Sequence, residues 1–434
     1  MTKYFHSVTL DEDKCRGCTN CIKHCPTEAI RVRNGKAIII KERCIDCGEC
    51  IKVCPYHAKK AVTDPFSMIR EYRYKVAIPA PSLYGQFSRS YSRDRILQGL
   101  VELGFDWVLE VSQAAEIVSD ATRQLLATGN LKKPVISSAC PAVVRLIQVR
   151  FPNLIPNLLK IESPMELAAR IAKNTVSQEE GFPLEDIGVF FISPCAAKVT
   201  SVKAPYEKKE SSVNGVLAMK DIHIRLLDKM RKIPADIQSD LVCSGFDGVG
   251  WARSGGESYA LRNEQYLAVH GIHNVIKILE EIVEERLEGV EFVECLSCTE
   301  GCLGGPLTVE NPFVARTNLK WQIKKAKLKD FSDENSSRDY QELLWTEDVE
   351  YKPILKLDDD MMKAMKKMQK MEEINEGLPG LDCGACGAPS CKALAEDIVR
   401  GLACETDCIF KLREKVTSLS EQMKAMEQHT KKEP

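Results

Sequence analysis

The sequence contains no run of about 18 apolar residues, the length that a membrane-spanning helix requires, and no excess of charge of either sign. We therefore expect no membrane span. The 60 basic and 62 acidic residues nearly cancel, which gives no electrostatic basis for binding nucleic acid or a membrane surface. The first residues lack the apolar core of a signal peptide, so we expect a cytoplasmic protein.

Cysteine, in contrast, is abundant, with 19 residues among 434. Because the cytosol keeps thiols reduced, we do not expect these cysteines to form disulfides. Their short, regular spacings indicate metal sites instead. The length allows roughly two to four domains.

Two matching cysteine runs open the chain: Cys15-x2-Cys18-x2-Cys21-x3-Cys25-Pro and Cys44-x2-Cys47-x2-Cys50-x3-Cys54-Pro. This is the bacterial ferredoxin spacing, in which the fourth cysteine of each run binds the other cluster. It predicts one 4Fe-4S cluster on Cys15, Cys18, Cys21 and Cys54, and a second on Cys44, Cys47, Cys50 and Cys25. Structural zinc is the alternative, but the Cys-Pro ends and the doubled run favour clusters. We expect residues 1–66 to form an α+β dicluster ferredoxin domain.

From residue 67 to 320, short apolar runs alternate with amphipathic segments, which is the pattern of an α/β domain. Strands are expected at 74–79, 106–111, 135–137, 187–192 and 290–293, and helices at 95–104, 115–128, 142–150, 220–230 and 272–286. Three of these strands end at cysteines, namely Cys140, Cys195, and the pair Cys298 and Cys302. Because ligands commonly sit at the carboxyl ends of parallel strands, these four thiolates are predicted to hold one more 4Fe-4S cluster between two lobes.

This constellation resembles the iron-iron hydrogenases over most of residues 1–320. The signature segments of that family have counterparts here in the same order: Ser137-Ser-Ala-Cys-Pro141, Ser193-Pro-Cys-Ala-Ala-Lys198 and Glu294–Pro306. The resemblance implies a two-lobed domain of parallel sheets that holds an H-cluster and reversibly converts H2 to protons and electrons. It further implies that Cys302 bridges the 4Fe-4S cluster to a two-iron subsite carrying CO, cyanide and azadithiolate.

The resemblance also assigns residues around the two-iron subsite. Lys198 matches the family lysine that hydrogen-bonds a cyanide, as an ammonium can do in a dry pocket. A solvated side chain is the alternative for an isolated lysine, but the position three residues after Cys195 favours the cyanide role. Further residues match positions that contact or line the subsite: Ala80, Pro81, Ser82 and Pro164.

The departures from the family concern the proton path. The proton-relaying cysteine of the family is Ala139 here, and a methyl group cannot carry a proton. Later members of that relay fall near positions 121–122 and at Leu159, so the usual path is missing at every step. Two methionines that pack on the subsite become Ser193 and Leu296, and a serine there is expected to shift the redox poise. These traits resemble the sensory-type branch, with slow turnover.

Another proton route is then required, and Glu257 and Glu294 are our candidates. Glu294 precedes Cys298 by four residues, and Glu257 lies in a Gly-Gly-Glu turn. The alternative for each is a surface or structural carboxylate. Cys295 is a weaker candidate, because a spare thiol is often a small buried hydrophobe.

The remaining sequence comprises a charged linker and helix at 321–375, with an exposed loop expected at 333–337, and a further cysteine run. The methionines between Met361 and Met371 recur at helical spacing, which favours packing. At 376–408, Cys383-x2-Cys386-x4-Cys391-x16-Cys408 resembles a small 4Fe-4S domain. Zinc is the alternative metal, and Cys404 the alternative fourth ligand.

Residues 409–434 carry apolar side chains in a 3-4 heptad pattern, at Ile409, Leu412, Val416, Leu419, Met423 and Met426. A coiled coil in a homodimer and an amphipathic helix packed on its own domain remain equal alternatives. No kinase, PAS or DNA-binding signature follows, so an output would pass through a redox or signalling partner protein.

The cysteines thus account for three 4Fe-4S clusters and an H-cluster, with Cys243, Cys295 and Cys404 left over. The leading hypothesis is a hydrogen-sensing hydrogenase of low activity. A non-catalytic electron-transfer or cluster-assembly protein is the alternative, and a third reading is an ordinary hydrogenase with a replaced proton path.

Overall fold

The computed structural model describes residues 5–326, 340–354 and 356–430. The loop expected at 333–337 lies outside the described residues. The chain divides into two compact units, described separately below. Unit 1 comprises Met1–Thr9, Ile45–Gly48 and Ala61–Lys352, and unit 2 comprises Leu10–Cys44, Glu49–Lys60 and Pro353–Pro434. Along the chain, β1 (Val8–Leu10) and β4 (Lys59–Ala61) each run from one unit into the other.

Unit 1 contains two parallel sheets, which agrees with the predicted α/β class. The first has the strand order β6-β5-β8-β9, and the second has the order β10-β11-β7. Their bounds are β5 (Tyr74–Pro79), β6 (Trp107–Val108), β7 (Val135–Ile136), β8 (Ile187–Ser193), β9 (Gly215–Ala218), β10 (Tyr266–His270) and β11 (Phe292–Leu296). Every residue of β8 is buried, as expected for a central parallel strand covered on both faces.

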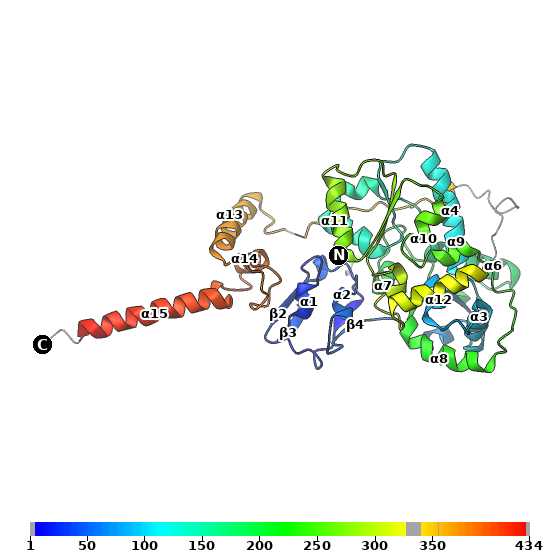
Figure 1. Cartoon of the computed structure of the whole chain (residues 1–434), viewed down its shortest axis with the longest axis horizontal. Helices are drawn as coiled ribbons and strands as arrows, with labels where there is room; N and C mark the ends of the chain where they lie inside the picture. Colours follow the sequence, from blue (N-terminus) through cyan, green and yellow to red (C-terminus); the bar gives the residue numbers. More distant parts are fainter. Residues whose placement is uncertain (1–4, 327–339, 355, 431–434) are drawn as a thin grey trace. The chain divides into compact units, whose positions relative to one another are not determined.

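Helices cover both sheets of unit 1. They are α3 (Arg93–Glu102), α4 (Val111–Ala127), α5 (Pro141–Arg150), α6 (Pro164–Glu179), α7 (Ala196–Lys203), α8 (Met219–Lys232), α9 (Phe246–Gly250), α10 (Gly256–Leu261), α11 (Ile272–Val283) and α12 (Pro312–Lys325). In the first sheet, α6 packs on β5 and β8, and α8 packs on β8 and β9. In the second, α10 and α11 pack on β10 and β11. The helices α4, α9 and α10 contact one another (Figure 1).

The largest differences between predicted and observed strand bounds occur at two strands. The strand expected at 106–111 is only Trp107–Val108, because α4 begins at Val111. The strand expected at 290–293 is shifted to Phe292–Leu296, so that Glu294 occupies its middle. The strand was predicted from its run of apolar residues, and the charged Glu294 interrupts that run. The predicted strand therefore ended before Glu294.

Unit 2 combines short ferredoxin-like elements with three C-terminal helices. The elements are α1 (Asn20–Lys23), β2 (Ile30–Arg33), β3 (Lys36–Ile39), α2 (Glu49–Lys52), α13 (Met361–Gly377), α14 (Cys391–Val399) and α15 (Ile409–Thr430). The antiparallel pair β2–β3 forms one hairpin, and α13 packs on α14. A small core forms around Met371, Leu378 and Leu394.

The expectation that the α13 methionines serve packing was wrong for most of them. Met371 is buried in the core with α14, whereas four others are exposed: Met361, Met362, Met365 and Met368. Only the C-terminal part of α13 contributes to this core, so regular helical spacing did not distinguish a packed methionine from a solvated one.

In the parts of the chain that the structure describes, no helix combines the length and the apolar character needed to cross a membrane.

Candidate functional site

Four cysteines of unit 1 come together at the carboxyl ends of three strands. Cys140 follows β7 and precedes α5, Cys195 follows β8 and precedes α7, and Cys298 and Cys302 follow β11. Burial, and then the charges of Cys298, Cys140 and Cys302, raise the pKa of the Cys195 thiol well above its usual value. The four sulfurs are therefore electrostatically coupled. Such a buried set disfavours thiolates unless cations compensate them, so it fits an iron-sulfur cluster.

The loops carrying Cys195 and Cys302 also contact each other through the backbone. The Leu307 N–H donates to the carbonyl oxygen of Pro194 at 3.0 Å. A Cβ atom at Gly305 would lie only 2.2 Å from that same oxygen, so this position requires glycine. The Gly-Gly-Pro segment thus holds two of the four cysteine-bearing loops together.

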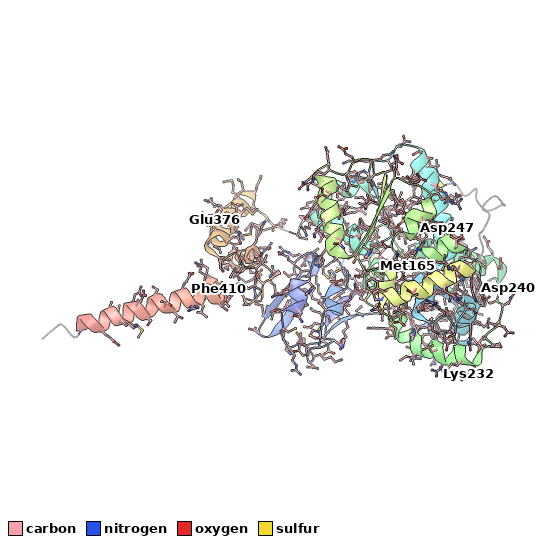
Figure 2. The ribbon with its side chains drawn as sticks, viewed as in Figure 1. Met165, Lys232, Asp240, Asp247, Glu376 and Phe410 are labelled. Carbon is pink, nitrogen blue, oxygen red and sulfur yellow. The ribbon has the colours of Figure 1, made fainter. Side chains whose placement is uncertain are left out.

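Beside these cysteines lies a mostly apolar cavity of about 90 Å³. Most of the residues predicted from the sequence line it: Ala80, Pro81, Ser82, Ala139, Cys140, Pro164, Cys195, Lys198, Glu257, Glu294, Leu296 and Cys302. Sequence reasoning missed other lining residues, including Met165 at the start of α6 (Figure 2) and Trp251. These two are ordinary core types, and only their position in space identifies them.

Lys198 brings a positive charge to this cavity from the first turn of α7. Burial raises the pKa values of Cys302 and of Glu257, and the charge of Lys198 opposes this rise. The N-terminus of α7 adds the partial positive charge of the helix dipole. This part of the wall therefore favours an anionic group over a neutral one.

The two glutamates proposed as relay residues form a buried pair beside the same cavity. Glu257 on α10 accepts a hydrogen bond of 2.6 Å from the Ser137 hydroxyl. Glu294 accepts hydrogen bonds from the Gly255 and Ser258 N–H groups and from the Ser258 hydroxyl, at 2.8–2.9 Å. Burial, and then the charge of Glu294, raise the pKa of Glu257 to about 8. The raised pKa of Glu257 is what a proton-relay residue would need, and Glu294 accepts more hydrogen bonds than Glu257 does.

The Ser137 hydroxyl links this pair to the position where the family has its relay cysteine. It donates to Glu257 and accepts from the Ala139 N–H at 3.2 Å. The positions of the usual relay offer no substitute: Ala121 and Leu159 are buried apolar residues, and the Thr122 hydroxyl donates to the Val118 carbonyl within its own helix.

Ser193 and Cys295 have other surroundings. The Ser193 hydroxyl donates to the Cys195 carbonyl and accepts from the Cys195 N–H, both at 3.0 Å, so it holds the ligand loop in place. Cys295 lies in β11 and is fully buried. Burial raises the pKa of its thiol well above the usual value, which keeps it protonated at neutral pH.

Glu207 is a buried carboxylate that sequence reasoning missed. Burial, and then the charge of Glu166, raise its pKa to about 7, whereas Lys198 lowers it. Its carboxylate accepts hydrogen bonds from the Ser163 N–H and hydroxyl, next to the cavity residue Pro164. The sequence around it is rich in charge and resembles an exposed loop, so it carried no signal of burial.

Asp46 anchors helix α7 through the side chain of Thr200. Its carboxylate accepts hydrogen bonds from Thr200 on α7 at 2.8 Å and from the Val8 N–H at 3.0 Å, and it contacts His6 at 3.1 Å. Burial disfavours the charge, but these partners hold the pKa of Asp46 below its usual value. Asp46 thereby ties the N-terminal strand and its own cysteine-rich loop to the helix that carries Lys198.

Replacing Asp46 by alanine will therefore lower the free energy of unfolding of unit 1 by about 2–4 kcal/mol, because buried polar partners lose their acceptor. Chemical denaturation under anaerobic conditions measures this change. The matched control is Asp228→Asn, which removes an exposed carboxylate on α8 that forms a surface ion pair with Lys232, and it should change stability by less than about 0.5 kcal/mol. Equal effects of the two substitutions would contradict the anchoring role.

In unit 2, the predicted ligands of the first ferredoxin cluster surround one small cavity. Cys15, Cys18, Cys21 and Cys54 all line it. Burial, and with it the charges of Cys18, Cys15 and Cys54, raise the pKa of Cys21 to about 11. The crossed contribution of Cys54 is the arrangement that the doubled motif predicts.

The ligands predicted for the second cluster are Cys25 after α1, Cys44 after the turn at Lys41–Arg43, Cys47 in the segment Ile45–Gly48, and Cys50 in α2. The two halves of the repeat share one further trait. The Cys25 sulfur accepts from the Ala29 N–H at 3.2 Å, and the Cys54 sulfur accepts from the Ala58 N–H at 3.3 Å. Hydrogen bonds of this kind help to set cluster potentials.

The C-terminal cysteines of unit 2 also assemble. Burial raises the pKa of the Cys386 thiol, and the charges of Cys383 and Cys408 raise it further. Cys391 begins α14, and its N–H donates to Asp382 at 2.6 Å. Cys404 is exposed and contacts Thr406 and Asp407 instead. This geometry favours Cys408 over Cys404 as the fourth ligand.

Parallel sheets, strand-end cysteines beside a cavity and further cysteine sets define a protein of the iron-sulfur class. Comparison with known proteins specifies the family. The family model "Iron only hydrogenase large subunit, C-terminal domain" matches residues 73–260 and 254–306, which is more than half of the chain. A 4Fe-4S dicluster model matches residues 7–55, and an Fe-S cluster model matches residues 378–410. The chain belongs to the iron-only hydrogenase family.

Individual relatives are distant. The chain is 28% identical to the periplasmic [Fe] hydrogenase large subunit of Nitratidesulfovibrio vulgaris, over 44% of this chain and 50% of that protein. It is 24% identical to iron hydrogenase 1 of Clostridium pasteurianum, over 69% of this chain and 64% of that protein. The cytosolic Fe-S cluster assembly factor nar1 of Aspergillus terreus is 34% identical over 22% of this chain and 17% of that protein.

Among solved structures, a variant of the [FeFe]-hydrogenase HydA1 from Chlamydomonas reinhardtii matches with a TM-score of 0.49 and 15% identity. The match covers 67% of this chain and 97% of that one.

Proposed function

We propose that the protein cleaves H2 reversibly and slowly, and that it senses hydrogen. The observation that carries this proposal is the cavity beside the four cysteines, into which Lys198, Glu257 and Glu294 all face. When bound there, an H-cluster would supply the two-iron centre at which H2 splits into protons and electrons, with its azadithiolate amine as base. The residues of the chain would hold this group, exclude water and move the protons.

Three parts of the wall would hold the group. The sulfurs of Cys140, Cys195, Cys298 and Cys302 would ligate the cubane. The Lys198 ammonium would donate to one cyanide, and the loop Ala80–Ser82 would contact the other. Apolar side chains such as Met165 and Leu296 would keep water out, which strengthens these charge-assisted contacts.

The glutamate pair would replace the missing cysteine as the proton relay. Glu257, with its raised pKa, would exchange protons with the cavity, while Ser137 orients its carboxyl group. Glu294 would share the proton with it, because two buried carboxylates do not readily ionise together. The relay lacks a group at Ala139 itself, and the longer gap would slow turnover.

Electrons would pass through three further 4Fe-4S clusters, on the cysteine sets predicted above, within domains at 1–66 and 376–408. A cytoplasmic redox or signalling partner would receive them. Slow turnover is sufficient for such a sensor, because it reports the presence of H2 and does not process it in bulk.

A second candidate function follows from the cluster-assembly relatives: a non-catalytic protein that keeps the cubane without the two-iron group. A carboxylate with a pKa near neutrality and a lysine charge inside an apolar cavity favour the catalytic proposal, since burying both without a ligand is unfavourable.

Hydrogen–deuterium exchange separates these proposals. Protein matured with the two-iron cofactor should form HD from D2 in H2O, at a rate well below that of high-turnover hydrogenases but above that of the same protein carrying only its cubanes. No HD formation by the matured protein would refute catalysis. A rate equal to that of high-turnover enzymes would refute the sensor reading and leave an ordinary hydrogenase with a different proton path.

We also propose that α15 forms a homodimeric coiled coil. Leu412, Val416, Leu419 and Met423 are all 46% or more exposed, so the alternative in which this seam packs on its own domain finds no support in the described residues. Sedimentation analysis of the full chain and of a chain ending at residue 408 tests this. A monomeric full chain would contradict the coiled coil.

A further inference from the structure

In unit 2, buried ion pairs join the C-terminal cysteine segment to the ferredoxin hairpin. Asp397 on α14 accepts from Arg31 Nε at 2.7 Å and from the terminal guanidinium nitrogen of Arg33 at 2.6 Å. Both arginines lie on β2. The Arg31 and Asp397 side chains are 6% and 4% exposed. Removing either partner of such a pair leaves an uncompensated charge in the interior, so this contact is strongly constrained.

A second pair lies beside the first. A guanidinium nitrogen of Arg43 donates to both carboxylate oxygens of Glu396 at 2.6 and 2.7 Å, and Arg400 binds the same carboxylate at 2.9 Å. Arg43 and Glu396 are each 5% exposed. Arg43 directly precedes the second cysteine run, and Glu396 follows Cys391 on the same helix. Two adjacent acidic residues of α14 are thus matched by three arginines of the ferredoxin segment.

Backbone contacts make the junction tight. The Val32 N–H donates to the Gly387 carbonyl at 2.7 Å, and Arg33 donates to the Cys386 carbonyl at 3.0 Å. Gly387 has φ +78°, and a Cβ there would lie 2.0 Å from the Val32 oxygen. The β2 strand can approach this closely only because residue 387 is glycine.

The cysteine loops themselves take part in this junction. Cys386, whose carbonyl binds Arg33, is a predicted ligand of the C-terminal cluster. A Cβ at Gly384, between Cys383 and Cys386, would meet the Ile22 side chain at 3.4 Å, and Ile22 directly follows Cys21. The β2 hairpin thus binds the ligand loop of the C-terminal cluster directly at Cys386 and Gly387, and Gly384 of that loop lies within one side chain's reach of Ile22.

We propose that the C-terminal cluster exchanges electrons directly with the ferredoxin clusters across this fixed junction, which Arg31, Arg33 and Arg43 form with Glu396 and Asp397. With both clusters bound, one electron would leave a reduced 4Fe-4S cluster on one side and reduce an oxidised one on the other, with no proton or bond changing place. This inference rests on the proposed clusters but not on the two-iron chemistry. The C-terminal cluster would then be the last electron carrier along the chain of unit 2, directly before α15.

The test combines hydrogen exchange with electron paramagnetic resonance on the full chain carrying its cubanes. In the wild type, the Val32 amide should exchange slowly, and dithionite-reduced protein should show a C-terminal cluster signal broadened by a neighbouring cluster. The variant Glu396→Lys with Asp397→Lys should speed Val32 exchange at least about tenfold and sharpen that signal, at unchanged iron content. Glu414→Lys, which breaks an exposed pair with Lys411 on α15, is the matched control and should change neither.

If the variant with Glu396→Lys and Asp397→Lys loses iron, the milder variant Asp397→Asn replaces it. Asp397→Asn should also speed Val32 exchange and sharpen the C-terminal cluster signal. Unchanged Val32 exchange and an unchanged signal in a variant with full iron content would overturn the proposal. So would a wild-type C-terminal signal with no magnetic interaction. Because neither readout needs H2, failure here is distinguishable from failure of HD formation by the matured protein.

Discussion

Glu257→Gln will reduce HD formation by the matured protein by about two orders of magnitude, which is the usual contribution of a positioned proton donor. A glutamine retains the shape and the hydrogen bond from Ser137, but it cannot gain and lose a proton. The infrared bands of the cofactor and the cubane signals should remain, because Glu257 is not a predicted ligand. Gas-phase mass spectrometry of D2 in H2O measures the rate.

Two controls assign this loss to the relay. Glu116→Gln removes another buried carboxylate, which binds the Gly245 and Gly248 N–H groups, and it should leave the rate nearly unchanged. The pH profile provides the second control. Because the pKa of Glu257 is raised to about 8, its proton is lost above that pH, so wild-type exchange should fall as pH rises through about 8, and the variant should lose that inflection. Wild-type rates in Glu257→Gln would remove this residue from the route.

The second large effect is expected at Lys198. Lys198→Met keeps the length of the side chain but removes the ammonium that would donate to a cyanide, and it leaves an anionic ligand without its charged partner. Retention of the two-iron group after maturation should fall at least about tenfold, while cubane iron stays constant. Iron analysis with infrared spectroscopy measures both quantities.

Lys203→Met is the matched control, because it lies on the same helix but pairs with Asp64 at the surface. It should retain the two-iron group as the wild type does. Full retention in Lys198→Met would show that the lysine is only a charged wall residue, and the cyanide role would then be rejected.

Cysteine spacing made most of this architecture predictable. Cysteines that bind iron-sulfur clusters require fixed local spacings, and parallel strands place their carboxyl ends at one edge of a sheet. Cys140, Cys195 and the Cys298 loop could therefore be expected to meet from the sequence alone. The resemblance to the hydrogenase family then placed Lys198 and Pro164 at the cavity that the structure shows.

Contacts between charged residues that are far apart along the chain could not be predicted from the sequence. Glu294 is buried because Gly255 and Ser258 solvate it, and neither has a fixed spacing from it. Arg31 and Asp397 are separated by 366 positions, and each alone resembles a surface charge. A polar group is buried only where a hydrogen-bonding partner is available. When that partner is distant along the chain, the local sequence around either residue carries no sign of the burial.

The methionines of α13 show the converse error. Their spacing is regular, yet only Met371 finds a packing partner in the small C-terminal core. An amphipathic pattern indicates which residues share one face of a helix. How much of that face is buried depends on which other elements pack against it.

The most direct test of the central claim is infrared spectroscopy of the protein matured with the two-iron cofactor, recorded under argon and then under H2. We expect CO and cyanide bands whose frequencies change under H2 and return under argon. Absence of these bands in protein with intact cubanes, or bands that do not respond to H2, would contradict it.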